Sequence, residues 1–169
     1  MFTAKDKVLY SSSGVCEITE ITRKKFGTEE KDYYVLVPVY RNASTVFVPV
    51  DSEALCVKMR KLPDKKGIDK LFASLSEELM PWEENKYLRH EKFMEIIEKG
   101  SEFEIFALAR LLVNKSRELL DKGKRLHITD ERMLDSARKL IDDMVAYVLD
   151  LPRDGICEFI SAKVNEAEK

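Results

Sequence analysis

The hydrophobic pattern of this 169-residue chain changes its period once, near residue 62. Before that point, short β-branched and aromatic runs alternate with turn residues, whereas after Leu62-Pro63 the apolar residues recur every three or four positions. A period of two is typical of strands, and a period of 3.6 is typical of helices. The switch therefore predicts an α+β protein with two domains, 1–62 and 63–169.

The first domain is predicted to contain five strands, because its apolar runs are short and bounded by Gly, Ser and Asn residues. Pro38 and Pro49 indicate sheet edges, because proline cannot donate a hydrogen bond to a neighbouring strand. Five strands in about 60 residues bury only a small core. We expect a small antiparallel sheet or partly open barrel that packs on the rest of the chain. The strands are expected at 7–10, 15–21, 33–37, 45–48 and 55–59, with 24–28 as one of the loops.

The second domain is predicted to be an all-α helical bundle. Ser101 and Glu104 form a capping-box pattern at the start of its third helix, and Gly123 follows the end of that helix. From Met133 to Leu151 the apolar residues form one continuous stripe, which is typical of a core face. The helices are expected near 66–79, 83–99, 102–122, 130–150 and 154–166.

Residues suited to catalysis or metal binding are sparse. His90 and His127 are the only histidines, and neither stands at a metal-ligand spacing from another ligand. The six glycines are solitary, so the chain has no phosphate-binding loop of the P-loop or dinucleotide type. We therefore expect no enzyme, no metal, no cofactor and no small-molecule substrate.

The cysteines and the apolar runs bear on the cellular compartment. Cys16, Cys56 and Cys157 lie far apart in apolar surroundings, which predicts buried thiols in a reducing compartment. No apolar run approaches the ~18 residues needed to cross a bilayer, and the first residues lack the apolar region of a signal peptide. We expect a cytoplasmic protein without a membrane partner.

The charge is unevenly distributed along the chain. Residues 1–62 include ten basic and eight acidic residues, whereas residues 63–169 include 19 basic and 23 acidic residues. Within the second domain, 115–139 holds eight basic and five acidic residues. These cations either complement the dipole at a helix end or contact a polyanion.

The only tryptophan, Trp82, follows Pro81 at a predicted helix start. A tryptophan in such a place either fixes the start of the helix against the core or projects toward a ligand.

Several segments, taken in order, carry a family resemblance. The chain resembles the CarD/CdnL family of bacterial RNA polymerase-binding transcription regulators, whose N-terminal module is shared with transcription-repair coupling factor. The segments are Phe2–Tyr10, Gly14-Val15, Tyr33–Leu36 and Thr45–Asp51, followed by Trp82, Gly100, Ala109–Leu112 and Glu131–Leu140.

The resemblance implies that the first domain is a Tudor-like β-module that binds the β subunit of RNA polymerase, partly through strand-to-strand contact. The residues expected at that interface are Arg23, Lys24, Lys25, Val46, Phe47, Val48 and Pro49.

The resemblance also implies that the helical domain contacts promoter DNA and stabilises the open complex. Trp82 is the expected minor-groove wedge, and nearby cations would hold phosphates without selecting a sequence, weakly in the absence of polymerase. The expected DNA-binding residues are Trp82, Lys86, Arg89, Lys122, Lys124, Arg125, Arg132 and Arg138.

Two features favour an alternative. Glu83 and Glu84 follow Trp82 directly, where family members often carry basic residues, and 140–169 is acidic. Carboxylates repel phosphates. The alternative is a non-catalytic adaptor that binds RNA polymerase and a second protein rather than DNA.

Overall fold

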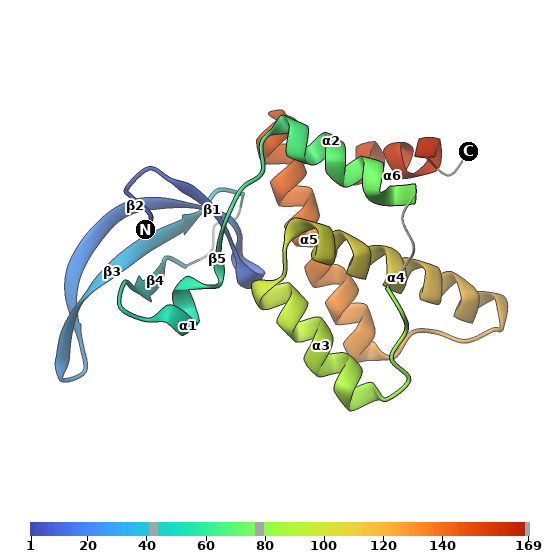
Figure 1. The fold of residues 1–169 in the computed structure, drawn as a ribbon, viewed down its shortest axis with the longest axis horizontal. Helices are drawn as coiled ribbons and strands as arrows, with labels where there is room; N and C mark the ends of the chain where they lie inside the picture. The colour runs from blue at the N-terminus through green and yellow to red at the C-terminus, as the bar shows by residue number, and fades with distance from the viewer. Residues whose placement is uncertain (41–43, 77–79, 168–169) are drawn as a thin grey trace.

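The computed structural model describes residues 1–40, 44–76 and 80–167. A five-stranded antiparallel sheet is followed by a helical region, which confirms the predicted α+β class. Figure 1 shows the sheet at one end of the molecule and the helices at the other, joined by the segment between β5 (Met59–Lys61) and α2 (Lys65–Ala73). None of the helices in these three ranges is long and apolar enough to span a membrane.

The sheet is open, with the strand order β4-β3-β2-β1-β5. Its edges are therefore β4 and β5. Pro49 lies on the edge strand β4 as predicted, whereas Pro38 ends the inner strand β3. The remaining strands are β1 (Lys7–Tyr10), β2 (Gly14–Phe26), β3 (Glu29–Pro38) and β4 (Val46–Pro49).

Two predicted boundaries in this region are wrong. Residues 24–26 are not part of a loop, because β2 continues to Phe26, and only 27–28 form the turn into β3, with Gly27 at φ +72°. The fifth strand begins at Met59 rather than at position 55, because the one-turn helix α1 (Glu53–Cys56) precedes β5. Glu, Ala and Leu are good helix formers, so this turn closes locally before the chain reaches the sheet.

The helical region largely follows the predicted pattern. The capping box of Ser101 and Glu104 is confirmed, and Gly123 follows the last turn of the third long helix with φ +69°. The predicted stripe from Met133 onward is buried over most of its length, which confirms it as a core face. The helices after α2 are α3 (Lys86–Lys99), α4 (Glu102–Asp121), α5 (Ile128–Leu149) and α6 (Ile156–Ala167).

Three helix boundaries differ from the prediction. α3 begins after position 83, because the Asn85 side chain caps it by accepting hydrogen bonds from two backbone N–H groups of the first turn. α5 begins before position 130, because the His127 ring caps it by accepting from the Thr129 N–H. The helix expected over 66–79 ends at 73 and continues as the 3₁₀ turn η2 (Ser74–Ser76), while 77–79 lie outside the described residues.

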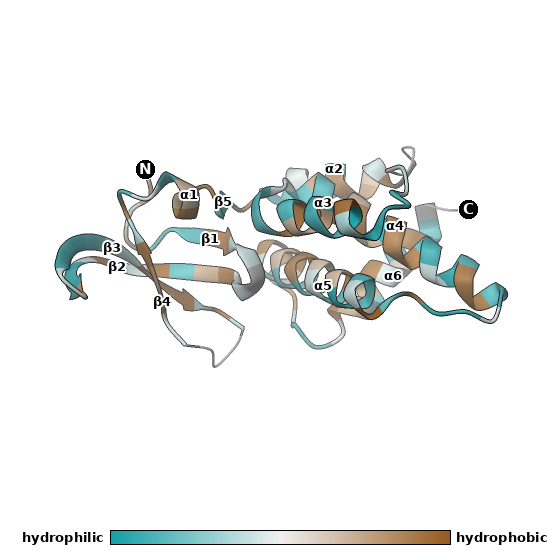
Figure 2. Ribbon diagram, turned by 90° about the horizontal axis from the view of Figure 1, so that it is seen from below, coloured by the Kyte–Doolittle hydropathy of each residue, from teal (hydrophilic) through white to brown (hydrophobic). Residues whose placement is uncertain are grey.

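The hydrophobic core has two parts that meet at the start of the sheet. Val8 points into the sheet cluster and its neighbour Leu9 points into the helical cluster, as the alternation of side chains along a strand requires. Val15 also joins the helical cluster. Figure 2 shows apolar residues along the helices beside the sheet. The two predicted domains therefore share buried apolar contacts.

Polar contacts add to this junction. The Arg60 guanidinium donates to the backbone carbonyls of Gly100 at 2.6 Å and Ile97 at 3.2 Å, at the C-terminal end of α3. Burial lowers the pKa of Arg60. Lys58 pairs with Glu98 at 2.8 Å. Cations at a helix C-terminus are stabilised by its dipole, so β5 is fixed to α3.

The predicted burial of all three thiols is wrong for one of them. Cys16 is buried and Cys56 is partly buried, but Cys157 is exposed on α6. Cys157 lines a hollow between α4, α5 and α6 that is open to solvent, so packing of α6 does not bury it.

Gly14→Ala should destabilise the protein more than the same change at Gly27. Both glycines have positive φ, which disfavours a side chain by roughly 1–2 kcal/mol. At Gly14 a Cβ would also overlap the buried Asp143 carboxylate, which Arg153 holds at 2.7 Å, whereas nothing lies near a Cβ at Gly27. We expect Gly14→Ala to lose about 1–3 kcal/mol more in denaturant unfolding. Equal losses would contradict this contact.

Candidate functional site

An aromatic cluster covers the outer face of the sheet beside its open edge. Phe26 lies 5.1 Å from Tyr33 and 5.5 Å from Phe47, measured between ring centroids. The Lys24 ammonium lies 4.2 Å from the centre of the Phe47 ring. Phe26 is 52% exposed, so the cluster presents apolar surface to solvent. We call Lys24, Phe26, Tyr33 and Phe47 the aromatic face.

The structure separates the residues predicted for polymerase binding. Lys24 and Phe47 lie on the aromatic face, whereas Arg23 and Lys25 point to the opposite side of β2, because successive side chains alternate. Arg23 is paired there with Asp32 at 3.0 Å.

The rest of the predicted set belongs to the edge strand. Val46, Val48 and Pro49 lie on β4, which pairs with β3 on one side only. Val48 is fully buried, so neither its side chain nor its backbone is exposed to a partner, whereas Val46 and Pro49 are partly exposed.

Phe26 and Tyr33 are absent from the predicted interface. Tyr33 lies opposite Thr22 on β2, and Phe26 stands two positions beyond Lys24 on the same face. These two residues can be recognised only from the register of the long β2–β3 hairpin. The prediction of a loop at 24–28 hid that register, because it ended the first strand of the hairpin too early.

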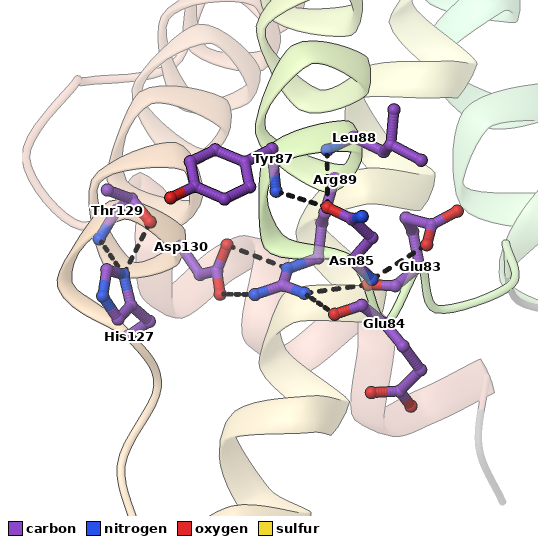
Figure 3. Close-up of polar contacts among 9 residues, drawn as sticks. All are labelled: Glu83, Glu84, Asn85, Tyr87, Leu88, Arg89, His127, Thr129 and Asp130. Carbon is purple, nitrogen blue, oxygen red and sulfur yellow. Dashed lines mark hydrogen bonds and ion pairs between the residues drawn. The ribbon is translucent and has the colours of Figure 1, made fainter.

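In the helical region, a buried ion pair joins the first turns of α3 and α5. Arg89 is 7% exposed, and its Nε and Nη2 donate to the two carboxylate oxygens of Asp130 at 3.2 and 2.9 Å. Figure 3 shows the Arg89 guanidinium of α3 bound to the Asp130 carboxylate of α5 in this bidentate geometry. Such geometry fixes both partners, so the two helix starts are held side by side.

Arg89 also fixes the segment that precedes α3. Its Nη1 donates to the backbone carbonyls of Glu83 at 2.8 Å and Glu84 at 3.2 Å. The Glu83 carboxylate accepts from the Asn85 N–H at 2.9 Å. The Arg89 guanidinium is thus engaged inside the protein, and this burial argues against Arg89 as a phosphate ligand.

Trp82 is partly buried and packs on the helical core. Its ring lies edge-on to Phe93 at 6.3 Å, with the Arg89 guanidinium 4.4 Å and the Lys115 ammonium 5.1 Å from its centre. Cations over an indole face are attracted to it. Trp82 therefore fixes the start of α3 and is only partly exposed.

Exposed apolar side chains stand at the two joined helix starts. Tyr87 is 71% exposed, and Leu88 and Ile128 are more than half exposed. Lys86 lies 5.0 Å from the centre of the Tyr87 ring. In Figure 3 the Tyr87 and Leu88 side chains point in different directions from α3. We call Trp82, Lys86, Tyr87, Leu88 and Ile128 the helix-start surface, because all five lie at or next to the two helix starts and are exposed or partly exposed, although they do not all face one side.

The other predicted DNA-binding cations do not form one cluster. Lys122 donates to Glu118 at 2.6 Å, and hydrogen bonds from Lys122 and Lys115 lower the pKa of Glu118. Lys124 and Arg125 are exposed in the connection between α4 and α5. Farther along α5, Arg132 is exposed and Arg138 lines a separate hollow.

Tyr87, Leu88 and Ile128 were not predicted as contact residues. The sequence feature that could have indicated them is an apolar residue in the first turn of a helix that does not belong to the apolar stripe facing the core. Over the described ranges, no group of three His, Cys, Asp or Glu side chains is placed to hold a metal ion.

Comparison with protein families places the N-terminal region. Residues 2–62 match the CarD-like/TRCF RID domain. This segment is a CarD-like/TRCF RID domain. The matched segment contains all five strands and ends where the hydrophobic period changes. The match suggests a role in transcription regulation. The match is consistent with the CarD/CdnL resemblance, and a search of curated proteins found no match for the chain.

Proposed function

We propose that this protein is a non-catalytic transcription regulator that binds the β subunit of RNA polymerase through its RID domain and stabilises the open promoter complex through its helical domain. The match of residues 2–62 to the CarD-like/TRCF RID domain carries the proposal. The contact with DNA would lie in the minor groove and be independent of sequence.

The sheet edge supports the polymerase contact. β4 is an edge strand, and strand addition takes place at sheet edges. Its Val46, Phe47 and Pro49 are partly exposed, whereas Val48 is buried. The aromatic face lies beside this edge and offers the exposed Phe26 ring and the partly exposed Phe47 ring, and aromatic residues are enriched at protein interfaces.

The helix-start surface supports the DNA contact. Two helix N-termini lie side by side, and their dipoles favour nearby phosphates. Tyr87 and Leu88 offer apolar contacts to unstacked bases or sugars, and the partly buried Trp82 is the proposed wedge. The cations left for phosphates are Lys86, Lys122, Lys124, Arg125 and Arg132, whereas Arg138 lies apart.

Phe26→Glu should weaken polymerase binding by roughly tenfold or more, because it places a carboxylate in an aromatic contact. The full-length variant and the wild type would be titrated against purified polymerase. Phe103→Glu is the matched control, since Phe103 is 39% exposed but lies on α4, away from the sheet. If both variants bind equally to polymerase, the aromatic face is not the interface.

Free duplex DNA should bind weakly, with a Kd of ~10⁻⁴ M or poorer at physiological salt, because few cations are available to release counterions. Tethering to polymerase supplies an effective concentration on the order of millimolar. Anisotropy titration with a promoter duplex tests this. Tight, salt-insensitive binding by the protein alone would contradict it.

A photo-cross-linker at Tyr87 separates the DNA contact from the adaptor alternative. In the polymerase–promoter complex we expect cross-links to DNA at the edge of the melted region. Cross-links to protein alone would support the adaptor, which the exposed Glu84 beside this surface favours.

A further inference from the structure

A hollow between α4, α5 and α6 is separate from both proposed interfaces. Its volume is about 220 Å³. Phe106, Ile141 and Ile160 form part of an apolar floor, one from each helix. α6 lies on the other side of α4 from α3, so the hollow is remote from the start of α3 (Figure 1).

The rim of this hollow is positively charged. Arg117 and Arg138 are exposed, and within the described part of the chain neither forms a hydrogen bond or an ion pair. Arg110 differs, because it donates to the Ser74 and Leu75 carbonyls.

Asp142, the one acidic residue among the described residues of the lining, already has a partner. Asp142 pairs with Arg153 at 3.3 Å, and burial raises its pKa. The Arg138 guanidinium is close enough to Asp142 to oppose this rise of the pKa, but it forms no close ion pair with it in the described residues. The donors of Arg117 and Arg138 are therefore left for a ligand above the apolar floor.

We propose that this hollow binds a small amphiphilic anion, with an apolar chain or ring on the floor and one carboxylate or phosphate head between Arg117 and Arg138. The planar guanidinium matches both head groups. The volume equals that of about seven water molecules at ~30 Å³ each, so the occupant is small. An amphiphilic cation of the same size would be repelled by the positive charges of Arg117 and Arg138.

Cys157 supplies a reporter for occupancy. It lines the hollow and is exposed, whereas Cys16 is buried and Cys56 is partly buried with its Sγ 3.4 Å from the Pro49 carbonyl. The rate at which iodoacetamide alkylates Cys157 in the full-length protein should fall when the hollow is filled.

Four probes of one chain length separate charge from apolarity. Octanoate and octyl phosphate should protect Cys157, octanol should protect it at least about tenfold more weakly, and octyltrimethylammonium should not protect it. Octanoate and octyl phosphate also distinguish the two head groups. Equal protection by octanol and octanoate, or none by either anion, would overturn the proposal.

Two variants assign the effect to this hollow. Arg117→Gln with Arg138→Gln should weaken octanoate binding at least about tenfold and leave octanol unchanged. Lys92→Gln on the exposed side of α3 is the matched control. Ser161→Trp, at an exposed lining position, should fill the hollow and abolish protection by every probe. Wild-type octanoate binding by the double variant would refute the site.

Discussion

Arg89→Met should lower the free energy of unfolding by about 3–5 kcal/mol, the largest effect expected of any substitution considered. Removing one partner leaves the Asp130 carboxylate buried and unpaired, which is costly in a low-dielectric interior. The same change removes the donors that hold the Glu83 and Glu84 carbonyls. Denaturant unfolding of the full-length protein measures the loss.

Lys122→Met provides the matched control for Arg89→Met. It removes a cation from an ion pair with Glu118, but the Lys122 side chain is 60% exposed, and exposed pairs contribute only ~0–1 kcal/mol. Arg89→Lys should recover only part of the lost free energy of unfolding, because a lysine ammonium cannot form the bidentate hydrogen bonds that a guanidinium forms with a carboxylate. If Arg89→Met costs no more than Lys122→Met, the buried pair does not fix the helix starts.

Trp82→Ala should shorten the lifetime of the open promoter complex roughly fivefold to a hundredfold, if the proposed DNA contact exists. An aromatic side chain that stacks on a base contributes about 1–3 kcal/mol. The same change should also lower stability, because the ring packs against Phe93 and under two cations. The decay of polymerase–promoter complexes after a competitor challenge measures the lifetime.

A second destabilised variant separates these two effects of Trp82. Leu71→Ala removes a fully buried side chain on α2, and such truncations cost about 2–5 kcal/mol. Its open-complex lifetime should match the wild type wherever the protein is folded. Trp82→Phe should retain an intermediate lifetime. A Leu71→Ala defect as large as that of Trp82→Ala would make Trp82 a structural residue only.

The joined helix starts connect stability with the proposed function. Arg89 contacts Asp130, the Glu83 carbonyl and the Trp82 ring, so one guanidinium sets both the spacing of two helices and the position of the indole. A loss of this pair should therefore reduce DNA contact even where the protein remains folded.

The sequence alone determined the features that depend on short windows. The change of period near residue 62 predicts the two classes of structure, because strands and helices place side chains at different repeats. The capping box of Ser101 and Glu104 was predictable for a similar reason, since both hydrogen bonds join residues three apart. The one-turn helix Glu53–Cys56 was missed because four residues carry too little periodicity to distinguish it from a strand.

Only the tertiary structure decided which distant residues meet. Arg89 and Asp130 lie 41 residues apart, and nothing in either local sequence indicates that they pair. The aromatic face likewise depends on the register of β2, β3 and β4, which brings Phe26 to Phe47. Long-range pairs arise from how whole elements pack, and that packing is fixed by the summed burial of many side chains rather than by any local pattern.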